Sequence, residues 1–425
     1  MTTLALLLAL LLTVGSWFAF ARAAPVLRGG MLTMTFAFAL WYWLPAVNVL
    51  VLHYAGAGSF AVPAAAATHA AWLVLGYQAT MLLAQRGLAR WCRIDEDEAA
   101  RQLSPTLTWL GATVLLSSLA LVFVRFDDPV LSMRILGGAT SARDHLTFFN
   151  RSSGATESLT KLWEILNLWT ALFVLAAAVD ARRLLGAAAL MTIAALVVGF
   201  LGSGTRAVLL MAGFTVVAAA TLRPATSVAS RPSRLGLAVL AGLLLLAATA
   251  LGGRFRDGIG PIVADTLLVN TDMLSETAFA LDRLRGWQPA RVADFVLTPF
   301  SFLLPRFLGV DKTTPEHLVV YNRIRAGYDI VHGEGNVFPG IVADFHLVWG
   351  GFAGAALFAL FVIAVIAAVE AFGRGLAAGP VRRAWRIAVY AFLLVSVRNI
   401  QGSLVLVMLV GLIIAYSMQR LDRRA

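Results

Sequence analysis

Residues 2–21, TTLALLLALLLTVGSWFAFA, form an apolar run that contains no charged side chain. An α-helix needs about 20 apolar residues to cross the hydrocarbon core of a bilayer, so this run is long enough to span it. A cleaved signal peptide is the alternative, but no basic residue precedes the run, and Ala21-Arg-Ala-Ala is a poor cleavage site. We therefore expect residues 2–21 to form a first transmembrane helix.

The composition of the whole chain predicts the same class of protein. Hydrophobic residues make up 60% of the 425 positions and charged residues only 13%. A soluble core cannot bury so much apolar surface, so we expect an all-α polytopic membrane protein. The formal net charge of +11 is not by itself evidence for nucleic-acid binding, and the single cysteine, Cys92, excludes a disulfide framework or a cysteine-based zinc site. We expect no metal, no other cofactor and no nucleic-acid partner.

Apolar segments of sufficient length predict eleven transmembrane helices in a single membrane domain, residues 1–425. These segments lie near residues 2–21, 31–53, 63–85, 105–126, 161–179, 184–201, 207–222, 235–253, 339–369, 386–398 and 402–418.

The orientation of the helices follows from their short connections, because cytoplasmic loops of membrane proteins are enriched in Lys and Arg. Every second connection is basic, and so is the C-terminal tail. This pattern predicts an N-terminus outside and a C-terminus inside. It also places two long loops on the outer face: residues 127–160, and residues 254–338 between the eighth and ninth spans.

The 254–338 loop is too rich in structure to be a linker. Within residues 262–284, apolar side chains recur at helical spacing among charged ones. This pattern predicts an amphipathic helix that lies on the membrane surface or over the helix bundle.

An acidic pair and an aromatic run are also assigned to the ends of predicted spans. We expect Asp127 and Asp128 to cap or terminate a helix before Pro129. Trp41, Tyr42 and Trp43 are expected to anchor the second span at the membrane interface, where aromatic side chains are enriched.

Four arginines are placed where cations are unexpected. Arg206 ends the sequence Gly202-Ser-Gly-Thr-Arg, Arg254 and Arg256 open the long outer loop, and Arg398 lies between the last two spans. On the predicted topology all four reach the non-cytoplasmic face. These four arginines predict the binding of an anionic ligand such as a lipid diphosphate. The alternative is that each arginine side chain only reaches the headgroups of the surrounding lipids. There is no glycine-rich or Walker-type phosphate loop, which argues against direct use of a nucleotide sugar or ATP.

Short motifs give the chain a resemblance to a known family. They are Gly-Ser-Gly-Thr-Arg206, His332-Gly-Glu-Gly-Asn, Phe338-Pro-Gly, Asp344-Phe and Trp349-Gly-Gly-Phe-Ala-Gly354. With the span count and the large outer loop, they resemble bacterial oligosaccharide repeat-unit polymerases of the Wzy type. O-antigen ligases share the same general plan, and these motifs separate the two groups poorly.

The resemblance implies a GT-C-like, metal-independent and inverting glycosyltransferase. Its donor and acceptor would be polyprenyl-diphosphate-linked oligosaccharides at the periplasmic face of the bacterial inner membrane. Such polymerases usually depend on a chain-length regulator in the same membrane. The alternatives are an O-antigen ligase, which transfers glycan to a lipid A core, and a lipid-linked oligosaccharide flippase or transporter. A transporter is expected to carry charge along the bundle interior and to show two related halves, and neither feature is seen in the sequence.

The expected roles of the site residues combine this resemblance with their chemistry. Arg206, Arg254, Arg256 and Arg398 would bind the diphosphate, because guanidinium groups stay charged and bind phosphate oxygens bidentately. His332 is the candidate general base for the acceptor hydroxyl, with Glu334 as the substitute; an ordinary loop histidine and a solvated carboxylate are the alternatives. The candidate substrate-binding residues are Ser203, Thr205, Arg323, Arg325, Tyr328, Asn336 and Asp344.

Overall fold

The computed structural model describes thirteen stretches of the chain. They are residues 2–21, 33–44, 62–91, 105–126, 128–137, 155–181, 186–203, 207–222, 272–284, 316–326, 339–376, 380–396 and 403–422. Every regular element within these stretches is a helix. The helices fall into two compact units, and each unit is described by itself.

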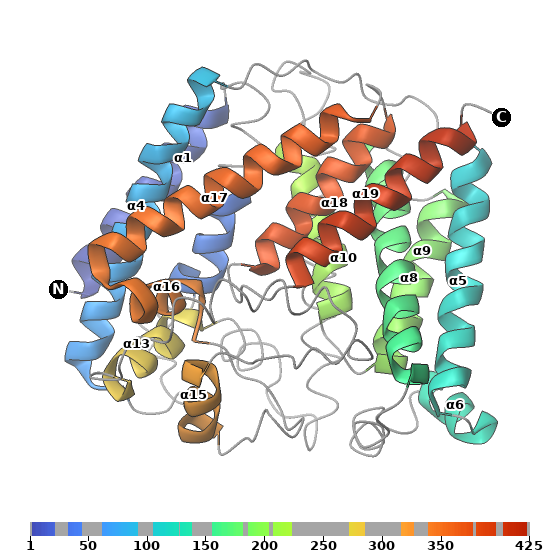
Figure 1. Ribbon diagram of the computed structural model, residues 1–425, viewed down its shortest axis with the longest axis horizontal. Helices are drawn as coiled ribbons and strands as arrows, with labels where there is room; N and C mark the ends of the chain where they lie inside the picture. The colour runs from blue at the N-terminus through green and yellow to red at the C-terminus, as the bar shows by residue number, and fades with distance from the viewer. Residues whose placement is uncertain are drawn as a thin grey trace. The chain divides into compact units, whose positions relative to one another are not determined.

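Unit 1 comprises Met1–Ile94, Ala264–Ala368 and Leu393–Leu406. Its helices are α1 (Thr2–Ala21), the π-helical turn η1 (Ala39–Trp43), α4 (Ala64–Trp91), α13 (Met273–Arg283), α15 (Glu316–Ala326), α16 (Ile341–Trp349) and the first part of α17 (Gly351–Arg374). Helix α4 contacts α1, α13 and α16, and α13 also contacts η1 and α16. Figure 1 shows α13 and α16 grouped with α15 in this unit.

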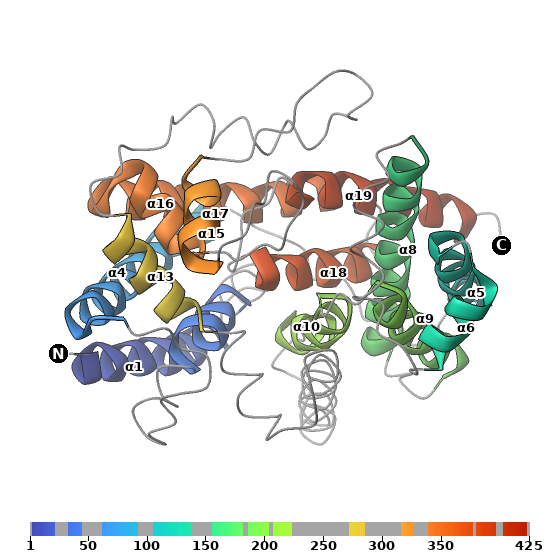
Figure 2. The same cartoon turned by 90° about the horizontal axis from the view of Figure 1, so that it is seen from below.

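Unit 2 comprises Asp95–Val263, Val369–Phe392 and Val407–Ala425. It contains α5 (Pro105–Phe126), α6 (Pro129–Leu136), α8 (Ala155–Asp180), α9 (Ala187–Ser203) and α10 (Ala207–Leu222), together with parts of α17, α18 (Pro380–Ser396) and α19 (Ser403–Asp422). Helices α5, α8 and α9 all contact one another, and α10 contacts α8 and α9. Figures 1 and 2 show these four helices side by side.

Apolar helices dominate the described residues, as expected of an α-helical membrane protein. Among the described residues, three segments are long and apolar enough to cross a bilayer: Leu107–Phe126, Leu162–Asp180 and Gly351–Arg374. Ala187–Gly202 is a shorter apolar helix. Large apolar side chains remain exposed on these helices, including Trp109 at 76% and Phe352 at 91%, which suits contact with lipid rather than water.

Several predicted segments coincide with helices. The bounds of α1, α5 and α10 match the predicted 2–21, 105–126 and 207–222. Predicted segments 63–85, 161–179, 184–201 and 402–418 correspond to α4, α8, α9 and α19, whose ends differ by a few residues or more. The predicted span 235–253 lies outside the described residues.

Two predicted spans have different bounds in the structure. The predicted 339–369 is divided at Gly350, whose φ of +79° ends α16 before α17 begins at Gly351. The predicted 386–398 begins earlier, because α18 starts at Pro380, a residue suited to the first turn of a helix. As a result Arg382, Arg383 and Arg386 lie within a helix rather than in a basic loop.

The aromatic residues assigned to the membrane interface are instead in the core of unit 1. Trp41, Tyr42 and Trp43 are all at most 1% exposed. The Trp41 indole donates to the Leu394 carbonyl at 2.7 Å, and the Trp43 indole donates to the Gln78 side chain at 2.8 Å. Interface anchoring was wrong for these residues because their polar atoms bond to protein.

Asp128 caps a helix, but the helix begins after it rather than ending before it. Its carboxylate accepts from the backbone N–H groups of Val130 and Leu131 at 2.9 and 3.2 Å. Pro129 occupies the first position of α6, where its missing N–H is not needed. Asp127 lies outside the described residues.

Candidate functional site

The candidate site is built around α13, a helix within the long loop 254–338. Asp272 immediately precedes this helix. The Asp272 carboxylate accepts from the Ser275 backbone N–H at 2.9 Å and from the Ser275 hydroxyl at 2.6 Å, which fixes the start of the helix. Because burial desolvates this carboxylate, its pKa is raised despite those two bonds. Helix α13 packs on α4, η1 and α16, so it lies over the helix bundle, one of the two predicted positions.

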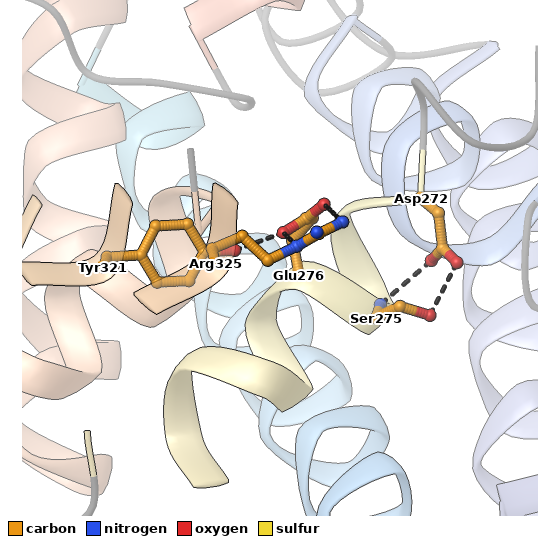
Figure 3. A network of polar contacts seen from close by, with 5 residues as sticks. All are labelled: Asp272, Ser275, Glu276, Tyr321 and Arg325. Carbon is orange, nitrogen blue, oxygen red and sulfur yellow. Dashed lines mark hydrogen bonds and ion pairs between the residues drawn. The ribbon is translucent and has the colours of Figure 1, made fainter. Parts of the chain in front are cut away.

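A buried carboxylate on α13 joins this helix to α15. Arg325 donates to Glu276 through Nε, at 3.1 Å from Oε2, and through Nη2, at 3.0 Å from Oε1. The Tyr321 hydroxyl donates to the same Oε2. Figure 3 shows the guanidinium and the phenol meeting the carboxylate, with Asp272 and Ser275 at the start of α13. We call Glu276, Tyr321 and Arg325 the loop trio.

Within the loop trio, Tyr321 and Arg325 both donate hydrogen bonds to Glu276, but the side chain of Arg325 is still partly exposed to solvent. The side chain of Glu276 is 8% exposed, whereas that of Arg325 is 20% exposed. Burial, and then the charge of Glu276, raise the pKa of Tyr321 far above its ordinary value. Tyr321 is therefore a hydrogen-bond donor throughout the physiological pH range and cannot serve as an ionised base.

The entry to α16 also packs against α13. The Thr277 hydroxyl donates to the Pro339 carbonyl at 2.8 Å, and the Val342 backbone N–H donates to the Tyr42 hydroxyl at 3.4 Å. Gly340 has a φ of +87°, and a Cβ there would lie 2.8 Å from the Tyr42 oxygen. The glycine of Phe338-Pro-Gly is thus explained by backbone conformation and close packing.

Asp344 follows in the first turn of α16 and is only 3% exposed. A helix N-terminus favours a carboxylate at this position. The neighbouring Ala343 packs against Tyr321, Ala280 and Leu284, which places this turn beside the loop trio. Arg325 and Asp344, two of the predicted substrate-binding residues, therefore lie on elements that meet at Tyr321, whose pKa the charge of Asp344 also raises.

The glycines of the Trp349-Gly-Gly-Phe-Ala-Gly354 motif have structural explanations. A Cβ at Gly354 would lie 2.2 Å from the Tyr77 hydroxyl and 2.7 Å from the Phe345 carbonyl oxygen. Gly350 takes the positive φ that separates α16 from α17. Close packing accounts for Gly354 and the positive φ accounts for Gly350, without a bound sugar.

The remaining predicted residues are placed as follows. Arg323 is on α15 and exposed, and Ser203 is the last residue of α9, in unit 2. The others lie outside the described residues: His332, Glu334, Arg206, Arg254, Arg256, Arg398, Thr205, Tyr328 and Asn336.

The sequence did not single out Glu276 or Tyr321. Glu276 lies three residues from Met273 and four from Ala280, so it falls on the apolar stripe of α13. A carboxylate on such a stripe signals a buried partner, but the partner, Arg325, is 49 positions away.

Other buried ion pairs were missed in unit 2. The Arg383 guanidinium donates to both Asp180 oxygens at 2.7 and 2.8 Å. Arg386 donates to Glu370 through Nη2 and Nε at 2.8 and 3.2 Å, and the Tyr390 hydroxyl donates to the same carboxylate at 3.0 Å. We call Glu370, Arg386 and Tyr390 the bundle trio.

Within the residues that the structure describes, no group of three or more His, Cys, Asp or Glu side chains is arranged to hold a metal ion. Comparison with protein-family models, curated proteins and solved structures finds no match to this chain. The chemistry of the site therefore rests on the residues themselves.

Proposed function

We propose that this chain is a membrane glycosyltransferase that polymerises polyprenyl-diphosphate-linked oligosaccharide repeat units. In this proposal eleven spans, with the N-terminus outside and the C-terminus inside, cross the bacterial inner membrane, and the reaction takes place at its periplasmic face.

The observation that best supports the proposal is the placement of the loop trio. Arg325 of the long loop is bound to Glu276 together with Tyr321, and Tyr321 packs against Ala343 in the first turn of α16, which carries Asp344. The motif residues Pro339 and Gly340 pack against the same helix, α13. The loop trio gives the long loop polar side chains next to apolar helices. Such a combination suits a substrate with a polar glycan and a lipid anchor.

The proposed reaction is an inverting transfer. The acceptor hydroxyl attacks the anomeric carbon of the donor glycan from the face opposite the diphosphate. The new C–O bond forms as the bond to the diphosphate oxygen breaks, and the hydroxyl proton passes to His332. Arg206, Arg254, Arg256 and Arg398 stabilise the negative charge that develops on the diphosphate. Arg325 and Asp344 position the glycan.

The test is polymerisation by purified protein with the native polyprenyl-diphosphate repeat unit and excess chelator. Wild-type protein is expected to give a ladder of products. Arg206→Ala and Arg254→Ala should abolish the ladder, and His332→Ala should reduce it by about 100-fold or more, the usual contribution of a general base.

Other outcomes separate the proposal from its alternatives. Transfer only after addition of a lipid A core acceptor would contradict polymerisation and identify a ligase. Tight binding of the lipid without transfer to either acceptor would identify a transporter. Full activity of all three variants would contradict the roles assigned to these residues.

A further inference from the structure

The short helix α6 of unit 2 has apolar side chains on two opposite sides. On one side, Ser132 and Ile135 are buried against the rest of the unit. On the other side, Val130 and Met133 have exposed fractions of 64% and 62%. A helix with apolar residues all round is normally surrounded by protein or lipid. The exposed side of α6 therefore requires an apolar environment.

The contacts of α6 place it at the level of the last turn of α5. The Ser132 hydroxyl donates to the Val122 carbonyl at 3.4 Å, and Ile135 packs against Val122 and Phe126. Val122 lies one turn before Phe126, the last residue of α5, which is about 6 Å along the helix axis. Figure 1 shows α6 next to this end of α5. Helix α6 thus lies beside the end of α5 rather than beyond it.

At this level α5 itself presents side chains suited to lipid. Leu107–Phe126 is long and apolar enough to span a membrane, and its last turns expose Phe123 and Val124. Interfacial helices bury their apolar side about 5–10 Å into the boundary between headgroups and acyl chains. A helix one turn inside the end of a span has this depth. Lipid that contacts the end of α5 therefore also covers the exposed side of α6.

The exposed side of α6 carries one cation. Arg134 follows Val130 by four positions, so it lies on the same side of the helix. Arg134 is exposed and forms no ion pair with the part of the chain that the structure describes, whereas Arg125 at the end of α5 is paired with Glu164. An arginine beside an apolar surface extends its charged end to the headgroups, where phosphate oxygens accept its hydrogen bonds. Its charge favours an anionic lipid over a zwitterionic one.

We propose that α6 is an interfacial helix that binds anionic phospholipid. Val130 and Met133 insert at the boundary between headgroups and acyl chains, and Arg134 binds a headgroup phosphate. This binding does not depend on glycosyl transfer, so it can be tested apart from the proposed function.

Nitroxide labels measure the depth of α6 in nanodiscs of phosphatidylcholine and phosphatidylglycerol. Cys92→Ser gives a cysteine-free background, because Cys92 is the only cysteine. Val130→Cys and Met133→Cys place labels on the exposed side of α6, where a substitution disturbs no packing. Leu116→Cys, at a position 67% exposed on α5, is the lipid-facing control. Power saturation by oxygen and by a nickel chelate should place the α6 labels within about 10 Å of the lipid phosphates, on the oxygen-accessible side. The control label should lie deeper.

Lipid selectivity tests the role of Arg134. A bimane fluorophore on Val130→Cys is quenched by doxyl-labelled phosphatidylglycerol or phosphatidylcholine at equal mole fraction. Phosphatidylglycerol should be enriched about fivefold near the fluorophore, the expected effect of one arginine close to anionic lipid. Arg134→Gln should remove this preference, and Arg134→Lys, which keeps the charge, should retain it.

Two results at the α6 labels would overturn the proposal. Labels that favour the nickel chelate would place this side of α6 in water. Labels reached by neither reagent would show that protein covers it, either a second copy of the chain or another membrane protein. A control label in water would also overturn lipid binding, because α5 would then not be a span. Equal quenching by both lipids in protein that retains Arg134, or an unchanged preference in Arg134→Gln, would exclude the headgroup contact.

Discussion

The loop trio and the bundle trio use the same three residue types in different settings. Each places a glutamate against an arginine and a tyrosine. In the bundle trio, Arg386 and Glu370 are 7% and 4% exposed and are carried by α18 and α17, which have 17 and 24 residues. In the loop trio, Arg325 is 20% exposed, and α13 and α15 have only 11 residues each.

We infer from this difference that the two trios have different roles. Isolated helices of fewer than about 12 residues are marginally stable, so α13 and α15 depend on contacts such as the loop trio to hold their positions. The bundle trio instead pairs two opposite charges that are both buried in the interior of unit 2. We infer that Arg325 can still meet a ligand from its exposed side, whereas Arg386 only maintains the fold.

The largest expected effect comes from breaking the bundle trio. Arg386→Ala leaves Glu370 buried without its cation, and loss of one partner from a buried pair costs about 3–5 kcal/mol. Chemical unfolding in detergent, followed by circular dichroism, measures the change. Arg386→Lys, which keeps the charge, should lose less. If Arg386→Ala has the same free energy of unfolding as wild type, Glu370 is not buried against Arg386.

Breaking the loop trio should cost less stability. Arg325→Ala leaves Glu276 without its cation, but water reaches this pair more easily, so we expect a loss of about 2–3 kcal/mol. The same unfolding assay applies. Adding Glu276→Gln to Arg325→Ala removes the stranded charge and should recover part of the loss. No recovery in the double variant would mean that Arg325 stabilises α15 by packing alone.

Substitution of Gly340 disturbs the entry to α16 beside the loop trio. Gly340→Ala places a side chain at a φ of +87° and a Cβ close to the Tyr42 hydroxyl, with an expected cost of about 2 kcal/mol. Combining it with Tyr42→Phe should relieve the contact but not the backbone strain. Each substitution is compared with Tyr42→Phe alone. A Gly340→Ala protein as stable as wild type would contradict the close packing of this turn.

The smallest effect is expected at the start of α13. Asp272→Ala removes the cap and should cost about 1 kcal/mol. Asp272→Asn keeps a capping side chain and removes a carboxylate whose pKa is raised by burial, so it should be as stable as wild type or more stable at neutral pH. A larger loss for Asp272→Asn than for Asp272→Ala would exclude the capping role.

The sequence predicted the helices best where a single apolar run determines their length. Helices α5 and α10 have the expected bounds because a charged or conformationally special residue adjoins each end of the apolar run. The division at Gly350 was missed because the apolar composition continues across it. Hydropathy does not report a positive φ.

The buried ion pairs were less predictable because their partners are distant in sequence. Asp180 and Arg383 are 203 positions apart, and nothing local to either residue identifies the other. Arg325 and Asp344 were predicted as substrate-binding residues; the structure places them on elements that meet at Tyr321, and their role stays a prediction. The failure at Trp41 has a similar cause, since its indole bonds to the carbonyl of Leu394.

The most direct test of the different roles of Arg325 and Arg386 is the polymerisation rate per folded molecule in Arg325→Lys and Arg386→Lys. Lysine keeps the charge but loses the bidentate geometry of arginine at both positions. Arg325→Lys is expected to lower the rate by about tenfold or more, the equivalent of one lost charge-assisted hydrogen bond to substrate. Arg386→Lys should lose stability and keep the wild-type rate per folded molecule. Equal rates in Arg325→Lys and wild type, with a reduced rate in Arg386→Lys, would contradict these roles.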